Sequence, residues 1–126
     1  MPREYAYEAI SEIYKLSDQI APHLLISEIR TVAEDDLWMS MAYGRPSVAL
    51  HFTWKQNWPA VQKVLPVIEQ HLAKFDVRPH WGKLFTLSPK VLQSRYERID
   101  DFRELISEFD PEGKFRNSFI DTYIFG

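Results

Sequence analysis

The chain contains no cysteine and only four glycines among its 126 residues. Without cysteine it can form no disulfide, carries no thiolate nucleophile and cannot hold zinc through thiolates. The four glycines stand apart from one another, so no glycine-rich loop is present to cradle the phosphates of a nucleotide. Thiol chemistry and a nucleotide-phosphate loop are therefore excluded within this sequence.

The sequence also has no excess of basic residues and no long apolar run. Its net charge is −3, and its local charge runs are mixed or acidic, as at Glu34–Asp36, which argues against a nucleic-acid partner. No apolar run approaches the roughly 20 residues that span a bilayer. The segment Met1–Glu4 lacks the apolar stretch of a signal peptide. We therefore expect a cytoplasmic protein with no membrane partner.

Hydrophobic residues make up 45% and charged residues 26% of the chain, which is the composition of a globular protein. At this length a single domain buries roughly two thirds of the surface that its unfolded chain exposes. The sequence contains no internal repeat, low-complexity segment or interdomain linker. It therefore predicts one domain with a substantial core.

The first half of the sequence predicts a helix followed by two strands. Apolar residues at helical spacing predict an amphipathic helix over residues 3–20, which Pro22 ends. Residues 23–31 and 47–54 have the pattern of strands. The stretch 32–46 has an acidic opening and a glycine–proline turn, which predicts a loop between the two strands.

The sequence after the second strand predicts another helix and one more extended segment. Asn57 is the expected N-cap of this helix, and Pro66 in its interior predicts a kink or a break. Residues 76–87 predict a short strand or an extended segment. The apolar stripe of the helix consists of Val61, Val64, Leu65, Ile68 and Leu72.

Two further helices and an apolar tail complete the chain. Ser88 and Pro89 predict the start of a short helix, and residues 99–109 predict a longer one that ends at Asp110–Gly113. The stretch 115–126 is too apolar for a free tail, so we expect it to pack on the remainder of the chain. The order helix–strand–strand–helix–strand predicts an α+β fold with helices on one face of an antiparallel sheet. It resembles a ferredoxin-like unit that lacks its opening strand.

Four polar side chains are expected on one face of the predicted sheet. Successive side chains of a strand point to opposite faces, so residue parity decides which of them lie together. The second strand has an unbroken apolar face, formed by Val48, Leu50, Phe52 and Trp54. If the helices cover this face, the opposite face of the sheet brings together Glu28, Arg30, His51 and Thr53.

Each of these polar residues also has an ordinary interpretation. Glu28 and Arg30 are two residues apart, as in a surface ion pair, and His51 alone resembles a hydrogen-bonded structural histidine. Lys83 follows a glycine and is typical of a loop lysine. What favours a site is that several polar groups share one face of a half-buried sheet. From these residues alone, a site and a solvated sheet face both remain open.

Other kinds of site find less support in the sequence. Glu28, His51 and His80 would offer metal ligands, but no HExxH or comparable ligand spacing is present. A serine–histidine–aspartate site would lack the G-x-S-x-G elbow of the hydrolases. We therefore expect no metal ion in this chain.

Three stretches of the sequence resemble one known family. They are SEIRTVAEDDLWMSMAYGRPSVALHFTW at residues 27–54, RPHWGK at residues 78–83 and DPEGKFRNSF at residues 110–119. In this order they are similar to the C-terminal third of the alditol (xylitol) oxidases, in the aldonolactone-oxidase branch of the vanillyl-alcohol-oxidase flavoproteins. The similarity runs over nearly the whole chain.

Members of this family are FAD-dependent oxidases with a flavin-binding domain and a substrate-binding cap domain. The resemblance implies that residues 1–110 are the C-terminal portion of an incomplete cap domain. It implies that residues 111–126 form the segment that returns to the flavin domain. The implied reaction is oxidation of the terminal hydroxyl of a polyol, or of a sugar lactone, with a hydride passing to FAD and O2 giving H2O2.

The resemblance also assigns roles to the polar residues. His51 is the expected base, and Glu28 supports it, because a neighbouring carboxylate raises the basicity of an imidazole. Arg30 and Lys83 are expected to hold the reacting oxygen and to stabilise negative charge that develops on it. These four residues and Thr53 are the expected substrate-binding residues.

The resemblance places His80 and Trp81 beside the flavin. The flavin-binding part of the family is absent from this sequence, so we expect the chain alone to be inactive as an oxidase. The flavin domain of a parent chain, or a separate flavin subunit, is then the expected partner. A stand-alone sugar-binding or protein-interaction module is the alternative, and a homodimer through the sheet face or the tail is a further possibility. The sequence does not identify the polyol or lactone.

Overall fold

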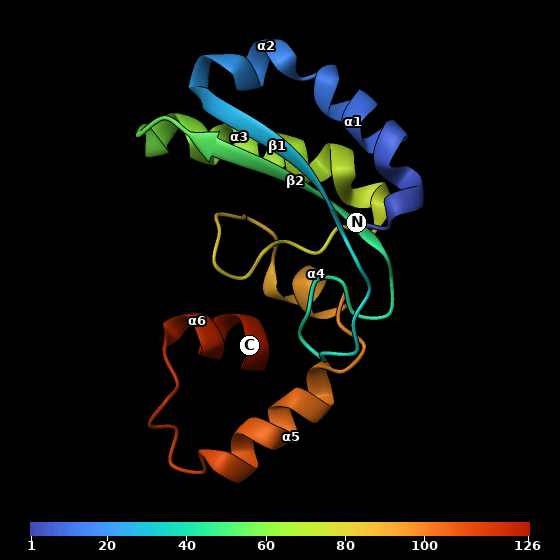
Figure 1. The fold of residues 1–126 in the computed structure, drawn as a ribbon. Helices are drawn as coiled ribbons and strands as arrows, with labels where there is room; N and C mark the ends of the chain where they lie inside the picture. Colours follow the sequence, from blue (N-terminus) through green and yellow to red (C-terminus); the bar gives the residue numbers. More distant parts are fainter.

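The computed structural model describes all 126 residues and contains a two-stranded antiparallel sheet with helices (Figure 1). The strands are β1 (Leu24–Val32) and β2 (Ser47–Trp54), and the α-helices are α1 (Ala6–Tyr14), α2 (Ser17–Ile20), α3 (Trp58–Leu72), α4 (Pro89–Gln93), α5 (Ile99–Phe109) and α6 (Ser118–Ile120). Short helical turns of other types are η1 (Arg3–Tyr5), η2 (Ala21–His23), η3 (Ala73–Phe75) and η4 (Asp121–Phe125). The predicted α+β class is confirmed.

The register of β1 against β2 decides which side chains share a face of the sheet. Glu28 lies directly opposite His51. Near its start, β1 carries one extra residue, Leu25, between Leu24 and Ile26, which is a β-bulge. Because of this bulge, Glu28 lies on the opposite face from Leu24, although the two residues have the same parity.

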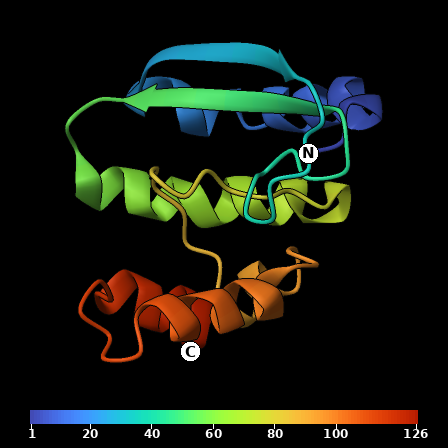
Figure 2. The same ribbon diagram turned by 60° about the horizontal axis from the view of Figure 1, so that its bottom comes forward.

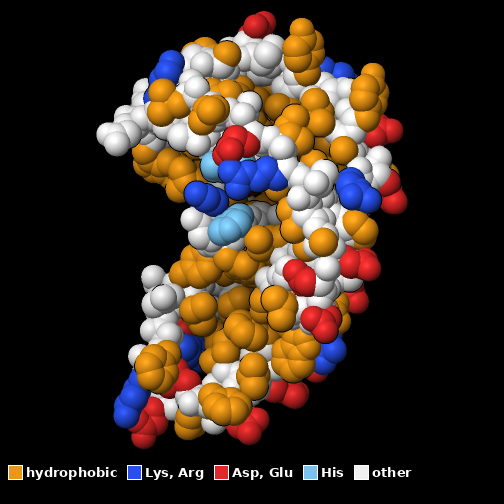
Figure 3. All heavy atoms as spheres, viewed as in Figure 1, with side chains coloured by type: hydrophobic (Ala, Val, Ile, Leu, Met, Phe, Trp, Pro, Cys, Tyr) orange, Lys and Arg blue, Asp and Glu red, His pale blue; other side chains and the backbone are white.

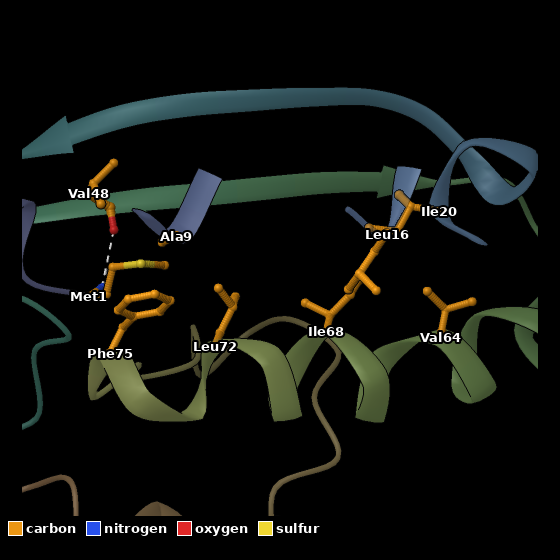
Figure 4. Packing of buried hydrophobic residues seen from close by; sticks show 9 residues of the cluster. All are labelled: Met1, Ala9, Leu16, Ile20, Val48, Val64, Ile68, Leu72 and Phe75. Carbon is orange, nitrogen blue, oxygen red and sulfur yellow. Dashed lines mark hydrogen bonds between the residues drawn. The ribbon is translucent and has the colours of Figure 1, made fainter. Parts of the chain in front are cut away.

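The larger hydrophobic core, here called the first core cluster, lies between the sheet and α1, α2 and α3 (Figure 4). It contains Met1, Ala9, Leu16, Ile20, Val48, Val64, Ile68, Leu72 and Phe75. Leu50, Phe52 and Trp54 pack against it from the apolar face of β2. The predicted parity of β2 is therefore confirmed, and the face that carries His51 is left without a helix over it.

The N-terminal helix is broken where a continuous helix over residues 3–20 was predicted. α1 ends at Tyr14, and Leu16 adopts non-helical backbone angles before α2 begins. Leu16 and Ile20 are both buried in the first core cluster. The break turns these two side chains inward, so tertiary packing overrides the helical propensity of this segment. The predicted end of the helix is confirmed, because α2 ends at Ile20 and Pro22 lies in the turn η2 that follows.

Helix α3 runs without a break from Trp58 to Leu72, so of the two outcomes predicted for Pro66, a kink or a break, the break does not occur. Pro66 is exposed, and so is Gln62, the residue whose carbonyl oxygen loses its helical hydrogen-bond partner to the proline. The N-cap prediction is confirmed, because the Asn57 side chain accepts a hydrogen bond from the Ala60 N–H at 3.3 Å. The whole predicted stripe of this helix is buried.

The segment 76–87 contains no strand, so the prediction of a third strand is wrong and only its alternative, an extended segment, holds. Side chains rather than a partner strand secure this segment. The buried guanidinium of Arg78 donates to the carbonyl oxygens of Arg95 at 2.8 Å and Tyr43 at 3.0 Å. Asp76, in a left-handed conformation with φ of 50°, forms ion pairs with Arg45 and Arg95.

A second core cluster lies in the lower half of the molecule, where α4, α5 and α6 form a layer separate from the sheet (Figure 2). Its buried residues are Leu92, Tyr96, Ile99 and Ile124. Ile124 belongs to the C-terminal stretch, so the prediction that the tail packs on the remainder of the chain is confirmed. Phe109 and Phe115, in contrast, are largely exposed.

One polar cluster ties α1 to α3 beside the first core cluster. The Glu12 carboxylate accepts hydrogen bonds from Lys15 at 2.7 Å, from Lys74 at 3.2 Å and from His71 Nδ1 at 3.0 Å. These hydrogen bonds lower the pKa of Glu12 from its ordinary value of 4.5 to about 2. The ionised form of Glu12 therefore helps to hold the two helices together.

None of the helices combines the length and the apolar composition that crossing a membrane would require.

Candidate functional site

Glu28, Arg30 and His51 meet on the sheet face that no helix covers. Because Glu28 and His51 are direct cross-strand partners, their side chains project side by side. The Glu28 carboxylate lies 2.8 Å from His51 Nδ1 through Oε2 and 2.7 Å from Arg30 Nη2 through Oε1. The predicted gathering of these three residues is confirmed by this geometry.

The hydrogen bonds among Glu28, Arg30 and His51 indicate which of these side chains carries each proton. The hydrogen bond from Arg30 and then that from His51 lower the pKa of Glu28, and Glu28 in turn raises the pKa of Arg30. Glu28 is therefore a carboxylate near neutral pH and can only accept hydrogen bonds. The hydrogen between Glu28 and His51 must then belong to Nδ1, which leaves the lone pair of a neutral His51 on Nε2.

A cavity of about 950 Å³, here called the β2 groove, runs along β2 beside these residues. Its walls are all of β2, the α3 residues Leu65, Ile68, Glu69 and Leu72, and much of the segment 77–87. The predicted site residues Arg30, His51, Thr53, His80 and Lys83 all line it. Figure 3 shows basic, acidic and histidine side chains gathered at the indentation between the two halves of the molecule.

A tight turn presents Lys83 to the β2 groove. The Lys83 N–H donates to the His80 carbonyl oxygen at 3.0 Å, and the Gly82 N–H donates to His80 Nδ1 at 3.0 Å. Farther along, Glu69 of α3 accepts hydrogen bonds from both the N–H and the hydroxyl of Thr86. The turn is therefore fixed at both of its ends, and Lys83 itself is exposed toward the groove.

Trp81 lies apart from the other predicted site residues. Its indole N–H donates to the Met39 carbonyl oxygen at 2.8 Å, and its ring centroid lies 4.9 Å from that of Tyr96. It packs against the second core cluster and does not line the β2 groove. Its visible role is to anchor the turn that carries Lys83, and a contact with flavin stays a prediction.

The sequence analysis missed three charged residues that line the β2 groove, namely Glu69, Arg78 and Arg95. Glu69 belongs to the amphipathic pattern of α3, and a glutamate on the polar side of such a helix gives no indication that it lines a site. Arg78 stands directly before the PHWGK run. A local pattern gives no sign that this arginine is buried, because its partners are 17 and 35 residues away.

The residues of this chain do not fit the phosphates of FAD. Gly44 and Gly113 have positive φ but stand alone, so no run of glycines offers a nest of backbone N–H groups. Neither does any group of three or more histidine, aspartate or glutamate side chains come together as metal ligands. The arrangement is suited to binding a small polar molecule and to moving a proton at His51.

Fold and cluster together define an α+β chain with a polar site on the uncovered face of a sheet. Comparison with known families is then decisive, because the family described as D-arabinono-1,4-lactone oxidase matches residues 1–123. The chain belongs to this family. The resemblance to the alditol and aldonolactone oxidases that the sequence motifs indicated is confirmed.

Individual relatives agree with this assignment. The alditol oxidase of Streptomyces sp. (strain IKD472 / FERM P-14339) is 45% identical over 126 residues, which is 100% of this chain and 30% of that protein. The L-gulono-1,4-lactone dehydrogenase of Mycobacterium tuberculosis (strain ATCC 25618 / H37Rv) is 29% identical over 122 residues, 94% of this chain and 28% of that protein. The L-gulonolactone oxidase of Mus musculus is 25% identical over 132 residues, 99% of this chain and 30% of that protein. The chain therefore spans less than a third of the length of these relatives.

Proposed function

We propose that this chain is the substrate-binding part of an FAD-dependent oxidase. Its substrate is a polyol oxidised at the terminal hydroxyl, or a sugar lactone, with O2 as the acceptor and H2O2 as a product. The observation that carries the proposal is that His51 lines the β2 groove while its Nδ1 lies 2.8 Å from the Glu28 carboxylate, so that in the neutral ring Nε2 is the acceptor. The names of the relatives, which are oxidases and dehydrogenases of alditols and gulonolactones, support the substrate class.

His51 acts in this proposal as the general base. The Glu28 carboxylate holds the ring through Nδ1, so that Nε2 can accept the proton of the substrate hydroxyl. As the ring becomes positively charged, the same carboxylate stabilises it at a distance of 2.8 Å. Glu28 needs no change in its own protonation, because its pKa is already lowered by Arg30 and His51.

Arg30 and Lys83 supply the positive charge at the site. Both line the β2 groove, and both are donors only, which suits an oxygen that gains negative charge as its proton leaves. Arg30 is oriented by its 2.7 Å hydrogen bond to Glu28, while the turn at residues 80–83 carries Lys83. Thr53, on the same strand as His51, offers a hydroxyl for a further hydroxyl of the substrate.

The flavin belongs, in this proposal, to polypeptide outside these 126 residues. The chain has no cradle for the FAD phosphates, so its own contribution is limited to binding the substrate and moving a proton. His80 and Trp81 would form the wall nearest the flavin, and residues 111–126 would contact the flavin domain. The chain alone is then inactive as an oxidase.

The proposal is tested by replacing the matching segment of the Streptomyces alditol oxidase with this chain, which is 45% identical to it over 126 residues. We expect the chimera to produce peroxide from xylitol or sorbitol. The variant His51→Gln in the chimera should lower kcat/KM by about 100- to 10,000-fold, the usual value of a general base. Glu28→Gln should cause a smaller loss, because it removes the support of the base and not the base itself.

The chain offers a matched control for this experiment. His71 has the same pairing as His51, with Nδ1 3.0 Å from a glutamate, but it belongs to the cluster between α1 and α3 and does not line the groove. His71→Gln should therefore leave kcat/KM of the chimera within a few-fold of the parent. If His71→Gln and His51→Gln reduce activity equally, or if neither does, His51 is not the base.

The same chimera distinguishes the proposed oxidase function from the alternative, a stand-alone sugar-binding or protein-interaction module. A well-folded chimera that binds flavin but forms no peroxide with any polyol or lactone would contradict the oxidase proposal. Shifts of the His51 ring resonances on adding polyol to the isolated chain would then favour a sugar-binding module.

A further inference from the structure

The segment that joins α3 to α4 carries Lys83 without the support of a sheet. This segment returns along α3 and then crosses to the lower layer of the molecule (Figure 2). Its residues 80–87, here called the Lys83 loop, belong to no helix or strand. Within the loop the one backbone hydrogen bond is local and runs from the Lys83 N–H to the His80 carbonyl oxygen. The position of Lys83 therefore depends on side-chain contacts that tie the loop to the remainder of the chain.

The ammonium group of Lys83 has no partner that would orient it. Lys83 is exposed, and it takes part in none of the ion pairs of the chain. A lysine side chain is a flexible four-carbon stem, so the volume that its ammonium can reach is set by the position of its backbone. Whatever fixes the backbone of the Lys83 loop therefore decides where this positive charge lies in the β2 groove.

Two anchors hold the Lys83 loop, one on each side of Lys83. On one side, the indole N–H of Trp81 donates to the Met39 carbonyl oxygen at 2.8 Å. On the other side, Thr86 donates to the Glu69 carboxylate through its N–H, at 2.6 Å, and through its hydroxyl. No other hydrogen bond joins the loop to the remainder of the chain. Three residues span at most about 10 Å, so the anchor at Thr86 restricts how far Lys83 can move.

The Glu69 carboxylate is well suited to hold this loop. Its Oε1 accepts from the Thr86 N–H and its Oε2 from the Thr86 hydroxyl, and hydrogen bonds to a carboxylate are stronger than those between neutral groups. Ile68, the preceding residue of α3, is buried in the first core cluster and holds the helix in place. Phe85 packs against the second core cluster, but such a contact is non-directional and does not orient the backbone as hydrogen bonds do. No ion pair joins Glu69 to Lys83, so the ammonium is left free.

We propose that Glu69 is a positioning residue for Lys83: through Thr86 it holds the Lys83 loop where the ammonium meets the reacting oxygen of the substrate. The effect on catalysis rests on the proposed function, whereas the hold on the loop does not. Glu69 acts through its two hydrogen bonds and not through its negative charge. A glutamine at this position keeps both bonds, because its carbonyl oxygen accepts from the N–H and its amide group donates to the hydroxyl oxygen. An alanine keeps neither.

The first measurement uses the chain as it is and does not involve activity. Backbone NMR order parameters of Gly82 and Lys83 should be about 0.85, the value of a rigid backbone, and should fall below about 0.6 in Glu69→Ala. Glu69→Gln should leave them close to those of the parent. Thr86→Val, at an exposed position outside α3, removes only the hydroxyl bond and should cause a smaller decrease. Unchanged order parameters in Glu69→Ala, or equal decreases in Glu69→Ala and Glu69→Gln, would overturn the proposal.

The second measurement uses the chimera with the Streptomyces alditol oxidase and peroxide production from xylitol. Glu69→Ala should lower kcat/KM by about tenfold, mainly through kcat, because a displaced ammonium weakens stabilisation of the developing negative charge. Glu69→Gln should restore most of kcat. In a chimera that already carries Lys83→Ala, the change Glu69→Ala should cause no further decrease, since the group that Glu69 positions is gone. An equal further decrease would show that Glu69 does not act through Lys83 and would overturn the proposal.

Gln70→Ala is the matched control for both measurements. Gln70 is the neighbour of Glu69 on α3, but it is exposed and does not line the β2 groove. Its truncation should leave the order parameters of the Lys83 loop and kcat as in the parent, and decreases equal to those of Glu69→Ala would contradict a specific role of Glu69. If the parent chimera forms no peroxide, the proposed function fails, while the order parameters still decide whether Glu69 holds the loop.

Discussion

Leu92 is the most deeply buried side chain of the second core cluster, with no exposed surface, and its truncation tests the packing of this half of the molecule. Leu92 belongs to α4 and packs with Tyr96, Ile99 and Ile124. This cluster also supports Trp81, which anchors the turn at Lys83. The variant Leu92→Ala should therefore destabilise the fold without touching the polar site.

The size of the effect follows from the burial. Replacing a buried leucine by alanine costs about 3 to 5 kcal/mol, and the lower value is expected where neighbours can relax into the cavity. Phe102, Ile106 and Ile120 around this cluster are only partly buried, so we expect about 3 kcal/mol. At about 2.1 cal/mol/K per residue, the entropy of unfolding of the chain is about 0.26 kcal/mol/K, so Tm should fall by about 11 °C.

Thermal unfolding followed by circular dichroism measures this change, and Val91→Ala provides the control. Val91 is the neighbour of Leu92 on the same helix but is 39% exposed, so its truncation should cost less than about 1 kcal/mol, or a few degrees in Tm. A Tm decrease of only about 3 °C for Leu92→Ala, or equal decreases for both variants, would refute a packed second core cluster in solution.

Three further substitutions test other parts of the fold. Because the pKa of Glu12 is lowered to about 2, Glu12→Gln should lower the Tm at neutral pH. The Tm difference from the parent should persist down to about pH 4.5 and vanish as the pH falls to about 2. A Tm difference that did not depend on pH would contradict an ionic role of Glu12. Asn57→Ala should cost about 1 kcal/mol in urea unfolding by removing the N-cap of α3, whereas Asn57→Ser should restore most of it. Gly113→Ala should cost about 1 to 2 kcal/mol because φ is +69° there, and an unchanged midpoint would show that the loop can adopt another conformation.

The parts of the fold that were predicted from the sequence are those set by local periodicity. The apolar stripe of α3 is buried in full, from Val61 to Leu72, because a repeat of 3.6 residues places it on one side of a helix. The faces of β2 were predicted for the same reason with a period of two. This parity is also what brought His51 and Glu28 together in the prediction, and the structure pairs them directly.

The parts that were missed depend on contacts between residues far apart in the chain. The break before Leu16 is set by the burial of that side chain, and the segment at Arg78 is held by carbonyl oxygens of two other segments. No local pattern encodes these partners. Glu69 escaped notice because its contribution depends on Thr86, 17 residues further along. The roles of the site residues themselves stay predictions, which the chimera and its variants test.

Because of the bulge at Leu25, β1 should tolerate the deletion of a residue before Glu28 better than the deletion of a residue after it. A deletion of one residue between Leu24 and Glu28 can be absorbed by pairing Leu25 or its successor regularly, which removes the bulge and keeps Glu28 opposite His51. A deletion of Ile29 cannot be absorbed in this way, because no bulge follows Glu28, and it turns Arg30 to the other face of the sheet. The site therefore tolerates a deletion in β1 before Glu28 but not after it. The spacing of two residues between Glu28 and Arg30 is what the site requires of this strand.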